Sequence, residues 1–133
     1  HLIRAVLEGT SFSLRDSIDF IKKKGIDIKQ PLRFIGGGTK SGLWLQILAD
    51  VLGMDGVIPR ATDPSVGAAL LAGVGTGVFT GLEEAKDFCA GKVKEVIHNP
   101  ERAAVYSKLF GLYKKAHDEL AGTYHALSAF ASG

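Results

Sequence analysis

Cysteine is nearly absent from this sequence, since Cys89 is the only one among 133 residues. A single cysteine excludes an internal disulfide and is typical of a reducing, cytoplasmic setting. No triad pattern of histidine and acid surrounds Cys89, so nucleophilic catalysis by this thiol has little support. The sequence is therefore not that of a small, disulfide-stapled secreted scaffold.

An excess of charge of one sign is also missing. Sixteen Lys and Arg residues oppose 14 Asp and Glu residues, which leaves a net charge of +2. The one basic run, Lys22–Lys24, falls at the predicted end of a helix, where cations complement the helix dipole. We therefore expect no nucleic-acid partner. The four histidines are scattered without a third ligand, so we expect no metal site; they are His1, His98, His117 and His125.

The sequence has no long, purely hydrophobic run. Its longest nearly uncharged stretch, residues 61–82, contains five glycines and a proline, so it predicts a buried helix and no membrane span. No signal-peptide pattern precedes the first helical pattern. A chain that begins within such a pattern, without Met, is expected to be an excised part of a longer protein. Its length suits one domain.

Periodicity divides the chain into helices and short strands. An apolar stripe predicts the first helix; its members are Leu2, Val6, Leu14, Ile18 and Ile21. The expected helices are 2–24, 41–52, 63–79, 82–88 and 99–127, and the expected strands are 31–36, 56–59 and 93–97. This order predicts an α/β fold, with helices packed on a small mixed sheet whose strands are mostly parallel. Pro59 places its strand near a sheet edge. The two clear strands are too few for a free-standing sheet, so further strands are expected from elsewhere.

The strongest local feature is the glycine run Gly36–Gly38 between a predicted strand and a helix capped by Ser41. Glycines let a ligand approach the backbone and direct free amides at an anion, of which phosphate is the most frequent. Thr39 and Lys40 could add a hydroxyl and a cation. The alternative is a tight turn that needs positive φ. Trp44 is more typical of a core side chain than of a stacking platform.

The loop matches neither common glycine motif. Lys40 and Ser41 follow the glycines without the spacing of a P-loop, and the dinucleotide-binding fingerprint is also absent. A second segment, residues 66–73, carries small residues along one side, which permits close packing against either the sheet or a ligand. Asp50 is either a polar contact inside a site or a surface or capping residue.

Three segments in order resemble the FGGY family of carbohydrate kinases. The first nine residues, which close on Glu8 and Gly9, are similar to the end of the family's second signature. Residues 36–50 resemble its adenosine-side loop and helix, and residues 67–79 resemble its second C-terminal helix. Within the family, the pattern is most similar to that of the xylulokinases. Relatives often place Glu where Thr62 stands, and Asp63 either takes its place or only caps the helix.

The resemblance implies an actin-like ATPase, ribonuclease H-like fold and identifies residues 1–133 as a C-terminal nucleotide-binding lobe. It implies phosphorylation of a sugar, most simply a ketopentose such as D-xylulose, with ATP and Mg²⁺ as cofactors. The sugar and the catalytic aspartate would belong to an N-terminal lobe absent from this chain. An exposed face that normally meets that lobe would allow a homodimer. The implied nucleotide-binding residues are Gly36, Gly37, Gly38, Thr39, Lys40, Ser41 and Trp44.

Two alternatives stay open at this point. One is a non-catalytic actin-like module with a regulatory or scaffold role. The other is an unrelated nucleotide-binding module, which a structure without the strand, triglycine loop and helix unit would favour.

Overall fold

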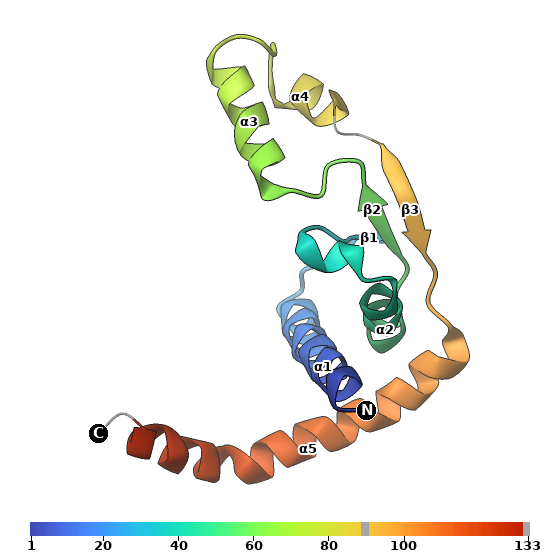
Figure 1. The fold of residues 1–133 in the computed structure, drawn as a ribbon, viewed down its shortest axis with the longest axis vertical. Coiled ribbons are helices and arrows are strands. Elements are labelled where there is room, and N and C mark those ends of the chain that lie inside the picture. The colour runs from blue at the N-terminus through green and yellow to red at the C-terminus, as the bar shows by residue number, and fades with distance from the viewer. Residues whose placement is uncertain (89–90, 132–133) are drawn as a thin grey trace.

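The computed structural model describes residues 1–88 and 91–131, and Cys89 lies outside them. The elements are α1 (Leu2–Lys23), β1 (Leu32–Arg33), the 3-10 turn η1 (Gly37–Lys40), α2 (Gly42–Leu52), β2 (Gly56–Pro59), α3 (Pro64–Gly75), α4 (Leu82–Phe88), β3 (Lys92–Val96) and α5 (Pro100–Ala131). Each expected helix and strand is present, with its ends shifted by a few residues. Figure 1 shows α1 and α2 beside the sheet, α5 running past both, and α3 with α4 at the far end.

Helix α1 continues without a break through Gly9. The hydroxyl of Ser11 donates to the Leu7 carbonyl at 2.8 Å and is therefore satisfied inside the helix. The helix predicted from the apolar stripe is confirmed, but the stripe is not its buried face, because Leu2 is 81% exposed while Ser11 and Phe12 are the buried residues of α1. The helix packs on its neighbours through its middle, and its first turns lie outside the core.

Helix α2 occupies the centre of the molecule and contacts α1, α5, η1 and β3. Its first turn is capped as predicted, since Ser41 Oγ accepts a hydrogen bond from the Trp44 amide at 3.3 Å. It ends at Gly53, whose φ of 61° is left-handed and suits glycine. Because both faces of α2 are covered, most of its second half is buried.

The sheet is mixed and has the strand order β1-β2-β3. Strands β1 and β2 are parallel, with Leu32 opposite Gly56, and β2 and β3 are antiparallel, with Gly56 opposite Val96. The predicted edge position of the second strand is wrong, since β2 is central. Pro59 is tolerated there because β2 ends at this residue, where the register with β3 shifts.

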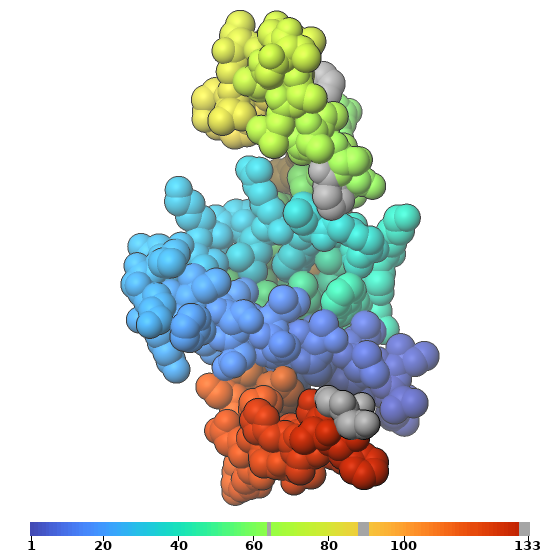
Figure 2. All heavy atoms as spheres, turned by 90° about the vertical axis from the view of Figure 1, so that its left-hand side faces the viewer, coloured from blue at the N-terminus to red at the C-terminus, as the bar shows by residue number. Residues whose placement is uncertain are grey.

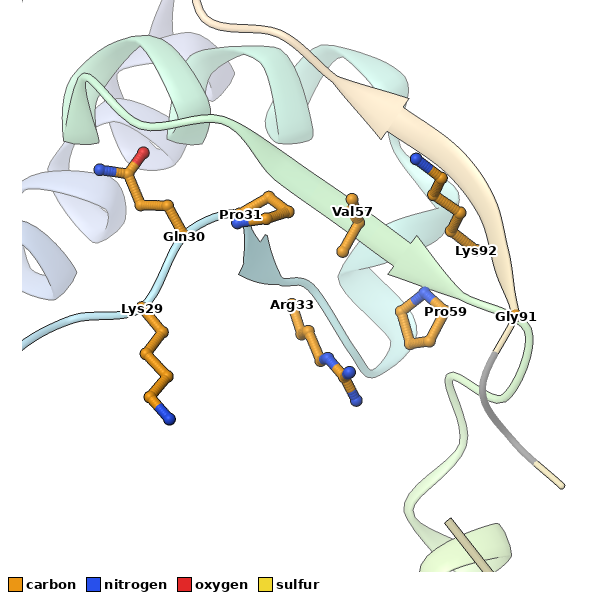
Figure 3. A pocket seen from close by; sticks show the side chains of 8 residues that line it. All are labelled: Lys29, Gln30, Pro31, Arg33, Val57, Pro59, Gly91 and Lys92. Carbon is orange, nitrogen blue, oxygen red and sulfur yellow. The ribbon is translucent and has the colours of Figure 1, made fainter. Parts of the chain in front are cut away.

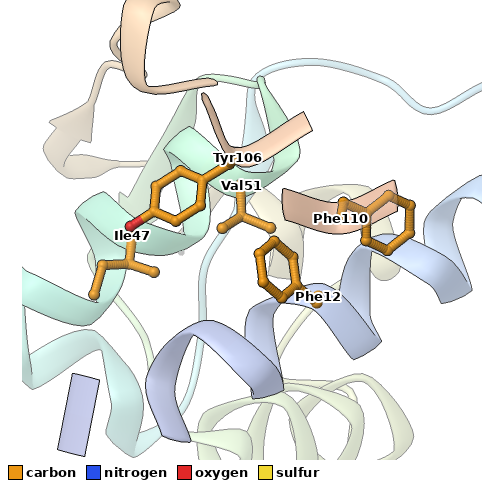
Figure 4. Packing of buried hydrophobic residues seen from close by; sticks show 5 residues of the cluster. All are labelled: Phe12, Ile47, Val51, Tyr106 and Phe110. Atoms are coloured by element: carbon orange, nitrogen blue, oxygen red, sulfur yellow. The ribbon is translucent and has the colours of Figure 1, made fainter. Parts of the chain in front are cut away.

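Two clusters of buried side chains lie on opposite sides of α2. The first joins α1, α2 and α5 through Phe12, Ile47, Val51, Tyr106 and Phe110 (Figure 4). The second joins α2 to the sheet through Phe34, Leu45, Ala49, Ile58 and Val96. In the first cluster the rings of Phe12 and Tyr106 meet edge to face at 6.1 Å between centroids. The helix that follows the glycine loop is thus fixed from both sides.

Asp50 on α2 is buried, which excludes the surface role, one of the alternatives left open by the sequence. Its side chain accepts hydrogen bonds from Gln46 Nε2 at 3.0 Å, the Asn99 amide at 2.7 Å and Arg102 Nε at 2.6 Å. The Asn99 side chain in turn caps α5 by accepting from the Arg102 amide at 2.9 Å. This network joins the C-terminal half of α2 to the start of α5.

Helix α3 is not the buried helix predicted from its apolar composition. None of its residues whose side chains are described is buried, and Leu71 is 63% exposed. The reason is that α3 packs mainly against α4, and the pair stands apart from the rest of the molecule (Figure 2). The helix also ends early, at Gly75, followed by Gly77 with a positive φ of 78°. Within the described residues, no helix is both long and apolar enough to cross a membrane.

Candidate functional site

The loop from Gly36 to Ser41 connects β1 to α2 and has the strand, triglycine and helix order expected. Gly36 has φ 89° and ψ −178°, a conformation that is essentially open to glycine only. Its amide donates to the Thr62 carbonyl at 2.8 Å. The loop after β1 is therefore tied to the segment that follows β2.

Two hydroxyl groups predicted to meet a ligand are used inside the loop. Thr39 Oγ1 donates to the Gly36 carbonyl at 2.7 Å, and the Thr39 amide approaches the same oxygen at 3.2 Å. Ser41 Oγ accepts from the Trp44 amide. Both side chains thus shape the turn, while the hydroxyl hydrogen of Ser41 is still available to donate to a ligand.

The amides of Gly37 and Gly38 have no hydrogen-bond partner among the residues that the structure describes. Gly37 is exposed, and a Cβ added to it would meet nothing within 4 Å. Two adjacent free amides, followed by a helix N-terminus, form an arrangement that binds anions such as phosphate. The predicted alternative of a tight turn also holds, because Gly36 does need its positive φ. A tight turn at Gly36 is compatible with an anion-binding role for the next two amides.

Trp44 lies against this turn. A Cβ added to Gly38 would stand 2.1 Å from Trp44 Cζ3, so no side chain larger than hydrogen fits between them without a shift. The indole is half-buried and belongs to neither cluster of buried side chains, so the prediction of a core side chain holds only in part. In the described part of the chain, its Nε1 is buried without a hydrogen-bond partner.

A hollow of about 320 Å³ opens beside the loop. It lies where the parallel strands β1 and β2 end, the edge at which open α/β sheets bind ligands. Its lining combines the end of β1, the segment after β2 and the start of α3, through Ile35, Ala61, Thr62, Asp63, Val66, Gly67 and Leu70. Position 67 borders open space on the α3 side of the hollow, since a Cβ there would meet nothing within 4 Å.

Asp63 lines this hollow and lies within range of the Lys40 charge. Asp63 Oδ1 accepts from the Ser65 amide at 2.9 Å and caps α3, as its place before Pro64 predicts. This backbone hydrogen bond, helped by the nearby Lys40 charge, holds the pKa of Asp63 below its ordinary value. The cation expected to face a ligand therefore acts on one residue of the hollow, although it does not line the hollow itself.

We expect Asp63→Ala to speed hydrogen exchange several-fold in the first turn of α3, because Ser65 loses its acceptor. A lowered pKa means that the charged cap contributes fully above the ordinary Asp range and is lost as the pH falls through the lowered pKa. The difference between wild type and variant should therefore be present at neutral pH and vanish in strong acid. Equal exchange rates at neutral pH would show that the cap contributes nothing.

A larger hollow, of about 520 Å³, lies elsewhere, on the side of the sheet that α2 does not cover (Figure 3). Its lining includes three cations, Lys29, Arg33 and Lys92, over Val57 and Pro59. Its polar groups are flexible, exposed side chains, and Lys92 is already paired with Glu95. The smaller hollow is the better candidate site, because it adjoins the fixed backbone donors of the glycine loop.

Sequence reasoning identified the loop but missed the other wall of the hollow. Ile35 and Thr62 were not predicted, because their places follow from the pairing of β1 with β2 and not from any local motif. Thr62 did carry one signal, since it stands where relatives often have Glu. Within the described residues, no three His, Cys, Asp or Glu side chains gather to hold a metal ion.

Residues 1–76 match the FGGY family of carbohydrate kinases, C-terminal domain, and the chain belongs to this family. Xylulose kinase of Bacillus subtilis strain 168 is 32% identical over 98% of this chain and 26% of its own length. The crystal structure of xylulose kinase from Rhodospirillum rubrum superimposes with a TM-score of 0.76 at 28% identity, covering 94% of this chain and 25% of that one. Glycerol kinase of Plasmodium falciparum, crystallised with ADP, gives 0.69 at 25% identity, covering 90% and 24%.

The fold is therefore α/β and actin-like, of the kind found in FGGY kinases. The chain spans about a quarter of the length of the relatives it matches. The other three quarters of those relatives have no counterpart in residues 1–133.

Proposed function

We propose that residues 1–133 form the C-terminal, nucleotide-binding lobe of an ATP-dependent carbohydrate kinase. The observation that carries the proposal is the pair of free amides at Gly37 and Gly38, at the edge where two parallel strands end. The family match and the ADP in the glycerol kinase crystal both support a nucleotide as the ligand.

In this proposal the Gly37 and Gly38 amides donate to a phosphate of the nucleotide, and Lys40 supplies a cation at its side. The apolar walls of the neighbouring hollow, Ile35 and Leu70, would cover the base. Such a site positions the nucleotide and stabilises its charge, which is most of what phosphoryl transfer requires of a protein. Thr39 and Ser41 act on the nucleotide through the shape of the turn.

The proposed acceptor is a ketopentose such as D-xylulose, by analogy with the relatives named xylulose kinase. A glycerol kinase has a similar fold, so the fold of this chain does not by itself determine which acceptor is phosphorylated. The sugar-binding groups and the base that accepts the hydroxyl proton would lie in the rest of the full-length protein. The uncovered sheet face and the exposed apolar residues of α3 are the surfaces available to meet it.

ATP-dependent kinases commonly use Mg²⁺ to neutralise phosphate charge. The acidic side chains of the described residues do not form a cage for such an ion, so we assign no step to it here. In this proposal the phosphates of the nucleotide and bound waters would supply most of the ligands of a magnesium ion.

The test is a coupled assay of ADP release with D-xylulose, gluconate and glycerol as acceptors. We expect the full-length protein to be at least about tenfold more efficient with D-xylulose, a difference of about 1.4 kcal/mol in transition-state binding. The 133-residue chain alone should show no activity. Turnover by this chain alone would contradict the division of labour, and a full-length protein that binds ATP without phosphorylating any sugar would favour a regulatory or scaffold module.

A further inference from the structure

The glycine loop and the start of α2 form a closed set of contacts around Trp44. The Ser41 amide donates to the Gly38 carbonyl at 3.1 Å, and Ser41 Oγ accepts from the Trp44 amide at 3.3 Å. The Trp44 ring returns to Gly38, where an added Cβ would lie 2.1 Å from Cζ3 and 2.7 Å from Cε3. The position of the indole therefore limits the positions that the Gly38 backbone can take.

No hydrogen bond of the ring to the described residues holds the indole in this place. Its Nε1 is buried and has no partner among the residues that the structure describes. A buried N–H without an acceptor costs stability, so a polar bond does not explain the choice of side chain at this position. The ring atoms Cζ3, Cε3 and Cη2 are the atoms that lie nearest to a Cβ built on Gly38.

We propose that Trp44 is a positioning residue for the glycine loop. By contacting Gly38, its six-membered ring sets the direction of the Gly37 and Gly38 amides and thereby the affinity for nucleotide. The inference rests on the proposed nucleotide-binding function. It assigns Trp44 an indirect part, in place of the direct ligand contact implied by family resemblance.

The experiment is a double-mutant cycle between Gly38→Ala and Trp44→Phe in the full-length protein. Isothermal titration calorimetry measures the Kd for ADP of each variant. Gly38→Ala alone should weaken binding by about tenfold or more, because the methyl group collides with the indole. Trp44→Phe alone should weaken it about threefold or more, because the loop loses its contact surface. The double variant should bind better than Gly38→Ala, since the smaller phenyl ring leaves room for the methyl group. The two effects should therefore be coupled by about fivefold or more.

Gly37→Ala provides the matched control, because its added Cβ meets nothing within 4 Å. Whatever its own effect on ADP binding, it should combine with Trp44→Phe without coupling. Thermal unfolding of each variant establishes that it is folded. If Gly38→Ala does not fold, Trp44→Phe alone is decisive, and an unchanged Kd in the folded variant overturns the proposal.

The outcomes separate this inference from the function on which it rests. A wild-type protein that does not bind ADP overturns both. A wild-type protein that binds ADP, with independent effects of Gly38→Ala and Trp44→Phe, overturns only the part assigned to Trp44. Coupling in the Kd for Gly38 and not for Gly37 supports it.

Discussion

Replacing Asp50 with alanine should lower the free energy of unfolding by about 2–3 kcal/mol, the upper end of the range expected when buried donors lose a charged hydrogen-bond acceptor. The Asp50 side chain is 2% exposed and accepts from the Asn99 amide and Arg102 Nε at 2.7 and 2.6 Å. Without the carboxylate, the Asn99 donor loses its acceptor at the junction of α2 and α5. Because domains are only marginally stable, this loss is a large share of the total. Urea unfolding of both proteins measures it.

Asp16→Ala is the matched control for Asp50→Ala. Asp16 also pairs with a cation of α5, at 3.2 Å from Lys114 Nζ, but its side chain is 53% exposed. Water can replace that partner, so the loss should stay below about 1 kcal/mol. If both variants lose less than about 1 kcal/mol of unfolding free energy, the buried hydrogen bonds of Asp50 do not stabilise the fold more than an exposed ion pair does.

Gly36→Ala should raise the Kd for ADP by about tenfold or more, provided that the proposed site is correct. The φ of 89° and ψ of −178° at Gly36 are strained for alanine by about 1–3 kcal/mol. To relieve the strain the loop would have to turn, which breaks the bond from the Gly36 amide to the Thr62 carbonyl. The two sides of the hollow would then separate. Titration with ADP measures the effect.

The control for Gly36→Ala is Gly25→Ala, which also replaces a glycine of positive φ, 79°, but lies after α1 and outside the site. Gly25→Ala should reduce thermal stability and leave ADP affinity unchanged. An equal loss of affinity in the two variants would mean that Gly36 acts through stability alone.

Features that depend on neighbouring residues could be predicted from the sequence. Ser41 and Asp63 cap helices because a short polar side chain reaches the amide two or three positions ahead. Gly53 ends α2 because glycine adopts a left-handed φ without penalty. The glycine loop was recognised for the same reason, and the family match agrees with the resemblance.

Features that depend on distant pairing could not be predicted. The place of β2 in the middle of the sheet follows from β3, which pairs with it only after two intervening helices. The exposure of α3 cannot be predicted from its composition, since an apolar helix has the same sequence pattern whether or not a partner covers it. The hollow beside the loop needs Ile35 and Thr62 to meet across two strands, so no single motif describes it.

Trp44 is the only tryptophan of the 133 residues, and it lies against Gly38. Its emission therefore comes from a single place, the turn that carries the free amides. The fluorescence of the indole should therefore report on that turn without an added dye. A change in its emission wavelength or intensity on titration with nucleotide would follow movement of the loop directly. In the isolated chain, the side chain that positions the loop is also its built-in optical probe.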